Sequence, residues 1–147
     1  MTSSPSAPPV PTDSARYRFW VDEEVRFADL DAQGHVNNNA FGVFFEHGRV
    51  EFMRHLNSFG PGTPWLIVLA RSIIDYRAEL HYPAAFRIGL GLLRLGNSSF
   101  TIGAGVFKDG QCISTHEAVC VLMGADTRRP IPIPDGLRAS LSAHTLA

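Results

Sequence analysis

Alternating apolar and polar residues mark the first expected strand, which ends near Asp29. Its apolar positions are Tyr17, Phe19, Val21, Val25 and Phe27. A period of two is typical of a strand with one buried face. The acidic pair Glu23-Glu24 interrupts the alternation and indicates a bulge or bend.

An apolar stripe with helical spacing follows a polar loop. The stripe comprises Phe41, Phe44, Phe45, Phe52 and Leu56. This spacing predicts a helix from about Asn39 to Leu56, which ends before NSFGPGTP, a run of turn residues. Gly48 lies within the stripe and indicates that another backbone segment packs close to the helix.

From Trp65 onward the pattern changes to strands. Four runs predict them: WLIVLARSIIDYRAEL, FRIGLGLLRLG, SSFTIGAGVF and QCISTHEAVCVLMGAD. The third run ends at KDG, a hairpin turn signal. The prolines in TRRPIPIP exclude a further central strand, and Asp135 is expected to cap a short helix through about Ala143.

One strand, one long helix and four strands predict an α+β fold, in which a curved antiparallel sheet surrounds a central helix. Four glycines remove side chains from one face of that sheet. They are Gly89, Gly91, Gly103 and Gly105. A helix lying across this face needs the room, so we expect the glycines to face the helix.

Length and composition indicate one folded domain. The chain has 147 residues, of which 45% are hydrophobic, so disorder of the whole chain is excluded. Residues 1–15 are rich in proline, serine and alanine and predict a flexible tail, which leaves residues 16–147 as the domain. The formal net charge is -1 without a Lys/Arg block, which argues against a nucleic-acid partner.

Targeting and cysteine patterns point to an ordinary cytoplasmic protein. The N-terminal segment lacks the basic and apolar regions of a secretory signal. No apolar run reaches the roughly 18–20 residues of a membrane span. Cys112 and Cys120 lie eight positions apart in one expected strand, so their separation exceeds ~25 Å and excludes a disulfide between them. Their spacing also matches no metal site.

The segment FADLDAQGHVNNNAFGVFFEHGRVEFM, residues 27–53, resembles the signature of the hotdog-fold acyl-CoA thioesterases, in particular the 4-hydroxybenzoyl-CoA thioesterase-like group. A weaker likeness, including RLGNSSF and RRPIPIP, extends over most of the chain. The resemblance implies a hotdog fold, a five-stranded antiparallel sheet wrapped around one long central helix. It also implies hydrolysis of an acyl-CoA thioester without metal or cofactor, in a homodimer or homotetramer with active sites between subunits.

The same resemblance assigns candidate catalytic residues. Asp31 corresponds to the catalytic carboxylate, and Gly34, followed by His35, to the glycine beside the oxyanion contact. Asn38 stands where some relatives carry a histidine, so the participation of an imidazole is open. Another hotdog group places its catalytic glutamate on the central helix, which makes Glu46 a reserve candidate.

The position of Asp31 and Gly34 just before the expected helix suits the hydrolysis of a thioester. N–H groups at a helix start lack internal partners and lie at the positive end of the helix dipole. Gly34 permits positive φ and a close approach to a ligand, so amides around Gly34, His35 and Val36 are expected to polarise the carbonyl. Asp31 would act as nucleophile or as general base, and the sequence leaves both open.

Structural roles compete with catalytic ones at several of these positions. Asp29 and Asp31 are both suited to capping turns, and we assign capping to Asp29 and chemistry to Asp31. Asn39 is the preferred helix N-cap, whereas Asn38 either caps or holds a water or the thioester. We treat the remaining histidines as structural or surface residues: His47, His55, His81, His116 and His144.

A CoA substrate calls for basic and polar contacts along a narrow channel. The candidate substrate-binding residues are Val36, Arg94, Ser98, Ser99 and Arg128. The arginines are expected at strand ends within reach of phosphates, although ordinary surface charge is the better explanation for any single one. The serines follow a Gly-Asn turn, where relatives place polar residues near the pantetheine arm.

Two other functions compatible with these residues remain open. A hydratase or dehydratase acting on acyl-CoA would pair an acid with a histidine, as Asp31 and His35 are placed to do. A non-catalytic acyl-CoA or acyl-carrier-protein binding module would keep the channel without needing Asp31. The acyl group also stays open, and we expect residues 65–70, from the opposite subunit, to shape its cavity.

Overall fold

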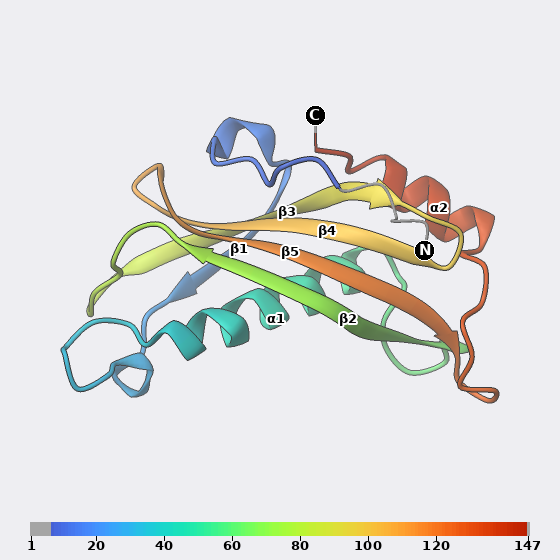
Figure 1. The fold of residues 1–147 in the computed structure, drawn as a ribbon, viewed down its shortest axis with the longest axis horizontal. Coiled ribbons are helices and arrows are strands. Elements are labelled where there is room, and N and C mark those ends of the chain that lie inside the picture. The colour runs from blue at the N-terminus through green and yellow to red at the C-terminus, as the bar shows by residue number, and fades with distance from the viewer. Residues whose placement is uncertain (1–6, 147) are drawn as a thin grey trace, which may run out of the picture.

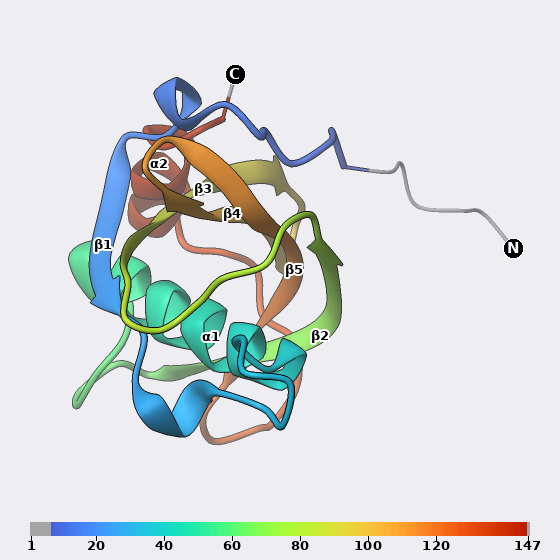
Figure 2. The ribbon, with the colours of Figure 1, turned by 90° about the vertical axis from the view of Figure 1, so that its left-hand side faces the viewer.

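The computed structural model describes residues 7–146, and one curved sheet surrounds a long helix in it (Figures 1 and 2). The strands are β1 (Phe19–Glu24), β2 (Trp65–Tyr76), β3 (Ala85–Leu95), β4 (Ser99–Lys108) and β5 (Gln111–Gly124). The helices are α1 (Asn38–His55) and α2 (Asp135–Ser142), with 3-10 turns η1 (Ser14–Arg16) and η2 (Phe27–Asp29). All strand pairs are antiparallel, in the order β1-β3-β4-β5-β2. The predicted α+β class, with a five-stranded sheet and one long helix, is confirmed.

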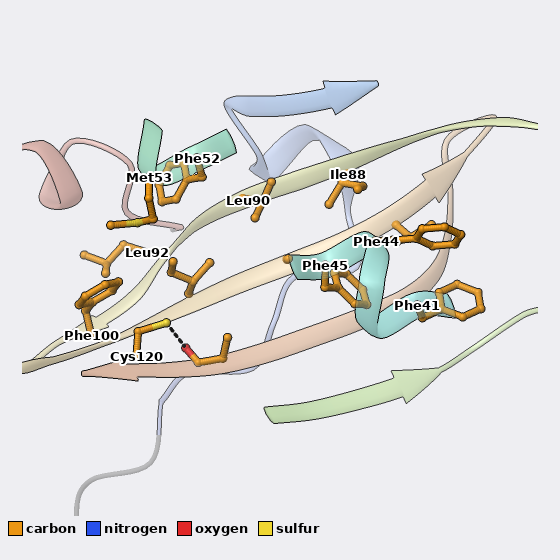
Figure 3. Close-up of a cluster of buried hydrophobic side chains, with 14 of the residues drawn as sticks. Phe41, Phe44, Phe45, Phe52, Met53, Ile88, Leu90, Leu92, Phe100 and Cys120 are labelled. Carbon is orange, nitrogen blue, oxygen red and sulfur yellow. Dashed lines mark hydrogen bonds between the residues drawn. The ribbon is translucent and has the colours of Figure 1, made fainter. Parts of the chain in front are cut away.

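Helix α1 packs its phenylalanine stripe onto the concave face of the sheet, as Figure 3 shows. Phe45 and Phe52 have no exposed surface, and they share a core with Ile88 and Leu90 of β3. A Cβ built on Gly48 would lie 3.1 Å from Ile88 and 3.3 Å from Leu90. The missing side chain therefore makes room for side chains of the sheet, and not for another backbone as expected.

The glycines of β3 and β4 face away from α1, so the expected reason for them is wrong. Along β3, Ile88 and Leu90 point at the helix, and strand alternation turns Gly89 to the opposite face. A Cβ on Gly89 would lie 2.7 Å from Tyr17. One on Gly91 would lie 2.6 Å from Leu146. Gly89 and Gly91 make room for the two ends of the chain, whereas a Cβ on Gly105 would lie 2.6 Å from Phe107 of the same strand.

Those chain ends form a second, smaller core on the outer face of the sheet. Tyr17 and Leu146 are buried there with Leu93 and Phe107, and Ala7 and Val10 pack against them. The Tyr17 hydroxyl donates a hydrogen bond of 2.7 Å to the Pro11 carbonyl. The flexible tail expected for residues 1–15 stays a prediction, and its residues 1–6 lie outside the described residues.

Three predicted element ends need correction. Strand β1 ends at Glu24 and not near Asp29, because the Asp29 carboxylate accepts the Arg26 N–H at 2.8 Å and closes the η2 turn. Asn37, not Asn39, is the N-cap of α1, and its side chain accepts the Asn39 N–H at 2.9 Å. Pro134 is the N-cap of α2, so Asp135 lies inside the first turn.

The sheet has one covered edge and one open edge. The outer edge of β3 is covered by β1 and then by the C-terminal segment, where the Leu146 N–H donates to the Leu92 carbonyl at 2.8 Å. Strand β2 is the other edge, and it exposes Val68, Leu69 and Tyr76. An exposed apolar edge strand is a template for pairing with another chain.

One smaller prediction, the turn at KDG, is confirmed by the backbone. The β4–β5 hairpin turns at Asp109 and Gly110, both with positive φ, as KDG predicted. Cys112 and Cys120 are both free thiols. Neither α1 nor another helix in residues 7–146 combines the length and apolar character that crossing a membrane requires.

Candidate active site

A tight loop between η2 and α1 brings Asp31 and His35 together. The Asp31 N–H donates to the His35 carbonyl at 3.0 Å, and the Gly34 N–H donates to the Asp31 carbonyl at 3.1 Å. Gly34 has φ +87°, a conformation that favours glycine, as expected. Leu30 and Val36 close the loop as an antiparallel bridge. The loop thus folds Asp31 back towards the start of α1.

The Asp31 carboxylate has one oxygen in use and one open. Its Oδ1 accepts the Gln33 N–H at 2.9 Å. Its Oδ2 lies 3.9 Å from His35 Nδ1, and the side chain is 29% exposed. Asp29, two residues earlier, is buried with both oxygens bonded to Arg26. The structure therefore gives Asp29 the structural role that was expected and leaves Asp31 facing an imidazole and solvent.

Residues beyond β2 complete this group of charges, which we call the loop cluster: Asp31, His35, Glu79 and His81. Glu79 Oε1 lies 3.9 Å from His35 Nε2, and its Oε2 lies 3.3 Å from His81 Nε2. The Val36 N–H donates to the Leu80 carbonyl at 2.8 Å, which docks residues 77–80 against the loop. No sequence pattern indicated Glu79, because only the fold brings residues 79 and 35 together.

A cavity of about 320 Å³ lies beside the loop cluster. The loop and the start of α1 line one side with His35, Val36, Asn38 and Phe41, and residues 76–80 line the other. The Tyr76 hydroxyl crosses between the sides and donates to the Asn38 carbonyl at 3.2 Å. The predicted site residues His35, Val36 and Asn38 therefore share one cavity, with Asp31 next to it.

The amides available at this cavity differ from those expected. The Gly34 and Val36 N–H groups already donate to backbone carbonyls, so neither is free to polarise a substrate. The Asn39 N–H is held by the Asn37 cap. The His35 and Asn38 N–H groups donate to no acceptor among residues 7–146. The Asn38 N–H therefore remains as a free donor at the first residue of α1, and the His35 N–H as a free donor in the loop before the helix.

The other predicted substrate-binding residues lie at the opposite end of the sheet (Figure 1). Ser99 pairs with Val121 on β5, whereas Tyr76 at the cavity pairs with Ser114. Seven residues of strand separate these levels, or roughly 23 Å. Ser98, Arg94 and Arg128 lie at the same far end as Ser99. A single chain does not bring them to Asp31.

Glu46, the reserve catalytic candidate, also lies away from the loop cluster. It is exposed on α1, eight residues after Asn38, which is ~12 Å along a helix. It lines a different cavity, of about 280 Å³, together with Arg49 and the apolar side chains of Met53, Ile67 and Leu69. Ile67 and Leu69 belong to the same chain here, so the expectation that residues 65–70 of an opposite subunit shape the acyl cavity stays a prediction.

A second polar group, which we call the interior cluster, links α1, β2 and β5: Arg49, Ser72 and His116. His116 is 2% exposed, and burial together with the nearby Arg49 charge lowers its pKa to about 4. Arg49 Nη1 lies 3.4 Å from His116 Nδ1, and Ser72 Oγ lies 2.7 Å from Nε2. The neutral ring thus accepts from Arg49 and donates to Ser72. The sequence showed His116 only as a structural or surface residue.

The side chains that could bind a metal do not form a metal centre in the described residues. In the described part of the chain, no three His, Cys, Asp or Glu side chains gather as a metal site. The loop cluster joins its members through contacts of 3.3 to 3.9 Å between neighbours in a row. A row of alternating carboxylates and imidazoles is suited to orienting a base and moving a proton.

Comparison with known proteins gives a consistent family assignment. A family model described as the thioesterase-like superfamily matches residues 25–141. The YsmA protein of Bacillus subtilis is 25% identical over 130 residues, which cover 88% of each chain.

Solved structures agree with that assignment. The PA5185 protein of Pseudomonas aeruginosa has a TM-score of 0.84 and 28% identity, over 95% of this chain and 99% of its own. A thioesterase of Thermus thermophilus, solved with coenzyme A and Zn, has a TM-score of 0.74 and 29% identity, over 84% of this chain and 92% of its own.

Proposed function

The chain belongs to the thioesterase-like superfamily, and from that premise we propose that it hydrolyses an acyl-CoA thioester to a free acid and coenzyme A. The observation that supports this most is the cavity at the start of α1, which His35 and Asn38 line and beside which Asp31 lies, 3.9 Å from the His35 ring. The coenzyme A bound to the Thermus thermophilus thioesterase supports the choice of thiol.

The proposed reaction uses the open oxygen of Asp31. As general base, Oδ2 takes a proton from a water, whose oxygen attacks the thioester carbonyl. As nucleophile, the same oxygen attacks directly and water then cleaves the acyl-enzyme anhydride. In both routes the C–S bond breaks, CoA leaves as a thiolate, and one water is consumed. After a single turnover in ¹⁸O-water, label in Asp31 would establish the nucleophile route with water attack at the aspartyl carbonyl, because the general-base route never labels Asp31. Water attack at the substrate acyl carbon labels only the product in both routes, and trapping of the anhydride with hydroxylamine then separates them.

The negative charge that develops on the carbonyl oxygen needs donors. The free N–H of Asn38 lies at the first residue of α1, where the helix dipole adds positive potential, and the free N–H of His35 lies in the loop just before the helix. One well-placed donor of this kind is commonly worth ~3 kcal/mol. His35, flanked by the carboxylates of Asp31 and Glu79, is placed to orient Asp31 or to protonate the leaving thiolate.

A second subunit would complete the CoA channel. Two β2 strands paired antiparallel about a twofold axis would bring the Trp65 end of one chain beside the Tyr76 end of the other. The partner's far end would then carry Arg94, Ser98, Ser99 and Arg128 towards the loop cluster. We therefore retain these four residues as proposed contacts for the phosphates and pantetheine, in a homodimer or homotetramer.

Thiol release from a panel of aryl-, short- and long-chain acyl-CoAs tests the proposal. Wild type would be compared with Asp31→Asn, which keeps an oxygen for the Gln33 N–H. Asp22→Asn is the matched control, because Asp22 is 86% exposed and bonds Arg87 on β3, away from the loop cluster.

We expect release by wild type and by Asp22→Asn and a loss in Asp31→Asn. Hydration of an enoyl-CoA without thiol release would instead establish the hydratase function. Binding without either reaction, unchanged in Asp31→Asn, would establish a binding module.

A further inference from the structure

The cavity at the start of α1 has a polar mouth and an apolar floor. The lining residues that reach solvent are polar and mark the mouth: His35, Asn38, Tyr76, Arg77 and Glu79. The buried lining residues are apolar and form the floor: Val36, Phe41 and Leu80. The pantetheine arm of CoA leads to a nucleotide, so it has to leave the cavity through the mouth. The acyl group is left with the floor, where its apolar surface is removed from water.

Phe41 lies within one helical turn of the proposed reaction centre. It follows Asn38 by three residues, so the two share one face of α1 and lie ~4.5 Å apart along its axis. The Asn38 N–H is one of the free donors proposed for the carbonyl oxygen of the thioester. An acyl group that extends from this carbonyl towards the floor therefore meets the Phe41 ring within a few atoms.

Other aromatic rings hold the Phe41 ring in place. Its centroid lies 5.6 Å from that of Phe44 and 5.7 Å from that of Tyr76, both edge to face. Phe44 packs in turn against Phe86 of β3, with 4.8 Å between ring centroids. Figure 3 shows Phe41 and Phe44 side by side at one end of the core. Packing of this kind leaves Phe41 little room to turn away from a ligand.

The floor separates this cavity from the second cavity along α1. The second cavity, which Met53 and Ile67 line, shares no lining residue with the first. Phe45, which has no exposed surface, lies between them on the helix. The first cavity, of about 320 Å³, is near the small end of ligand pockets, which span roughly 300–1,000 Å³. It has to hold the thioester as well as the acyl group, so little space is left for a long chain.

We propose that Phe41 limits the size of the acyl group, so that the substrates carry a short chain or a single ring and not a long fatty acyl chain. This inference rests on the proposed thioesterase function. The Phe41 ring occupies the space that a longer chain would need, and forcing further methylenes into a packed core is costly. A second subunit paired along β2 would cover the side of the cavity near Tyr76 and leave this floor unchanged.

A series of straight-chain acyl-CoAs from acetyl to palmitoyl, together with benzoyl-CoA, tests this limit. Wild type would be compared with Phe41→Leu and Phe41→Ala, which remove increasing parts of the floor. Phe52→Leu is the matched control, because Phe52 is also a buried ring on α1 but packs against Phe19, away from this cavity. Thermal unfolding would show which variants are folded, and Phe41→Leu is the variant expected to lose less stability.

In wild type and Phe52→Leu, we expect kcat/KM to fall about 10-fold or more at the first chain length that reaches Phe41, as for a surplus methylene in a closed pocket. This length should increase in Phe41→Leu and increase further in Phe41→Ala, while release from acetyl-CoA changes little. Equal losses on all substrates would assign Phe41 a structural role and overturn the proposal. A wild type that cleaves palmitoyl-CoA as well as butyryl-CoA would overturn it too, because a second subunit would then supply the space.

Binding measurements separate this proposal from the proposed function. Calorimetry on Asp31→Asn, with and without Phe41→Leu, gives affinities for butyryl-CoA, decanoyl-CoA and free CoA without turnover. Tighter binding of butyryl-CoA than of decanoyl-CoA, by a margin that Phe41→Leu reduces, supports the size limit even if no thioester is cleaved. An affinity difference that Phe41→Leu leaves unchanged would overturn the size limit, whereas thiol release by wild type would still support the thioesterase function.

Discussion

The loop cluster and the interior cluster both place a histidine among polar partners, but with opposite electrostatics. His35 is partly exposed and lies between two carboxylates, Asp31 and Glu79, each 3.9 Å from a ring nitrogen. His116 is buried, contacts Ser72 and a guanidinium, and has a lowered pKa. Negative partners in water favour proton transfer, whereas burial beside a positive partner keeps the ring neutral.

The contrast shows that residue type does not fix a role in this protein. Each imidazole takes its properties from the charges that the fold brings to it. The loop cluster lies at the start of α1 beside free amides, and the interior cluster lies about three turns further along the same helix. One helix thus carries the proposed catalytic group at its start and a buried polar group about three turns away, and the substitutions below test what each group does.

Replacement of Asp31 by Asn should have the largest effect. We expect kcat to fall 10²- to 10⁴-fold, roughly the contribution of one general base, on every substrate alike. The melting temperature should stay close to that of wild type, because Asn keeps the bond to the Gln33 N–H. Steady-state kinetics and thermal unfolding would be measured on the same preparations. A substrate-dependent loss would contradict a role for Asp31 in the chemical step alone.

The interior cluster should make stability depend on pH. The pKa of His116 is about 4 in the folded chain and ~6.5 unfolded, so the folded state binds its proton less well. The neutral His116 ring therefore stabilises the folded state fully above pH ~6.5. As the pH falls towards 4, the free energy of unfolding decreases by about 3 kcal/mol in all. The free energy of unfolding, measured with urea near pH 7 and near pH 4.5, should differ less between the two pH values in His116→Gln than in wild type. Equal differences would mean that His116 is not held neutral.

Glu79→Gln tests whether the loop cluster acts as a unit. Removing this charge should loosen the orientation of His35 and lower kcat about 3- to 10-fold, well below the effect of Asp31. KM should change little, since the proposed role of Glu79 is to orient His35 and not to hold the substrate. Glu51→Gln on α1 is the control, because Glu51 pairs only with Arg54. A larger effect on KM than on kcat would place Glu79 in binding.

Tyr76→Phe should have the smallest effect. The Tyr76 hydroxyl donates to the Asn38 carbonyl at 3.2 Å but is exposed, so its loss should cost about 0.5 kcal/mol of stability. Activity should remain within about 3-fold of wild type. Thermal unfolding and kcat/KM on a short-chain acyl-CoA measure both. A drop comparable to that of Asp31→Asn would mean that this bond, which joins β2 to α1, sets the catalytic geometry.

The secondary structure was largely predictable, because it depends on local spacing. The phenylalanine stripe of α1, the four later strands and the Asp109-Gly110 turn all follow from patterns a few residues long. The end of β1 was not predictable, because η2 forms through a side-chain bond from Asp29 to Arg26 that the alternation hides. The face occupied by the glycines was also missed, because it depends on where the chain ends dock.

The sequence by itself determined an α+β domain, the position of the Asp31 loop before the central helix, and the resemblance that suggests a thioester substrate. Only the tertiary structure joined His35 to Glu79, Arg49 to His116 across 67 residues, and the free amides to one cavity. The physical reason is the separation along the chain over which each kind of interaction acts. Periodicity and turn chemistry act between neighbours in the chain, whereas the charge around a side chain is set by strand register and helix packing, which bring distant residues together.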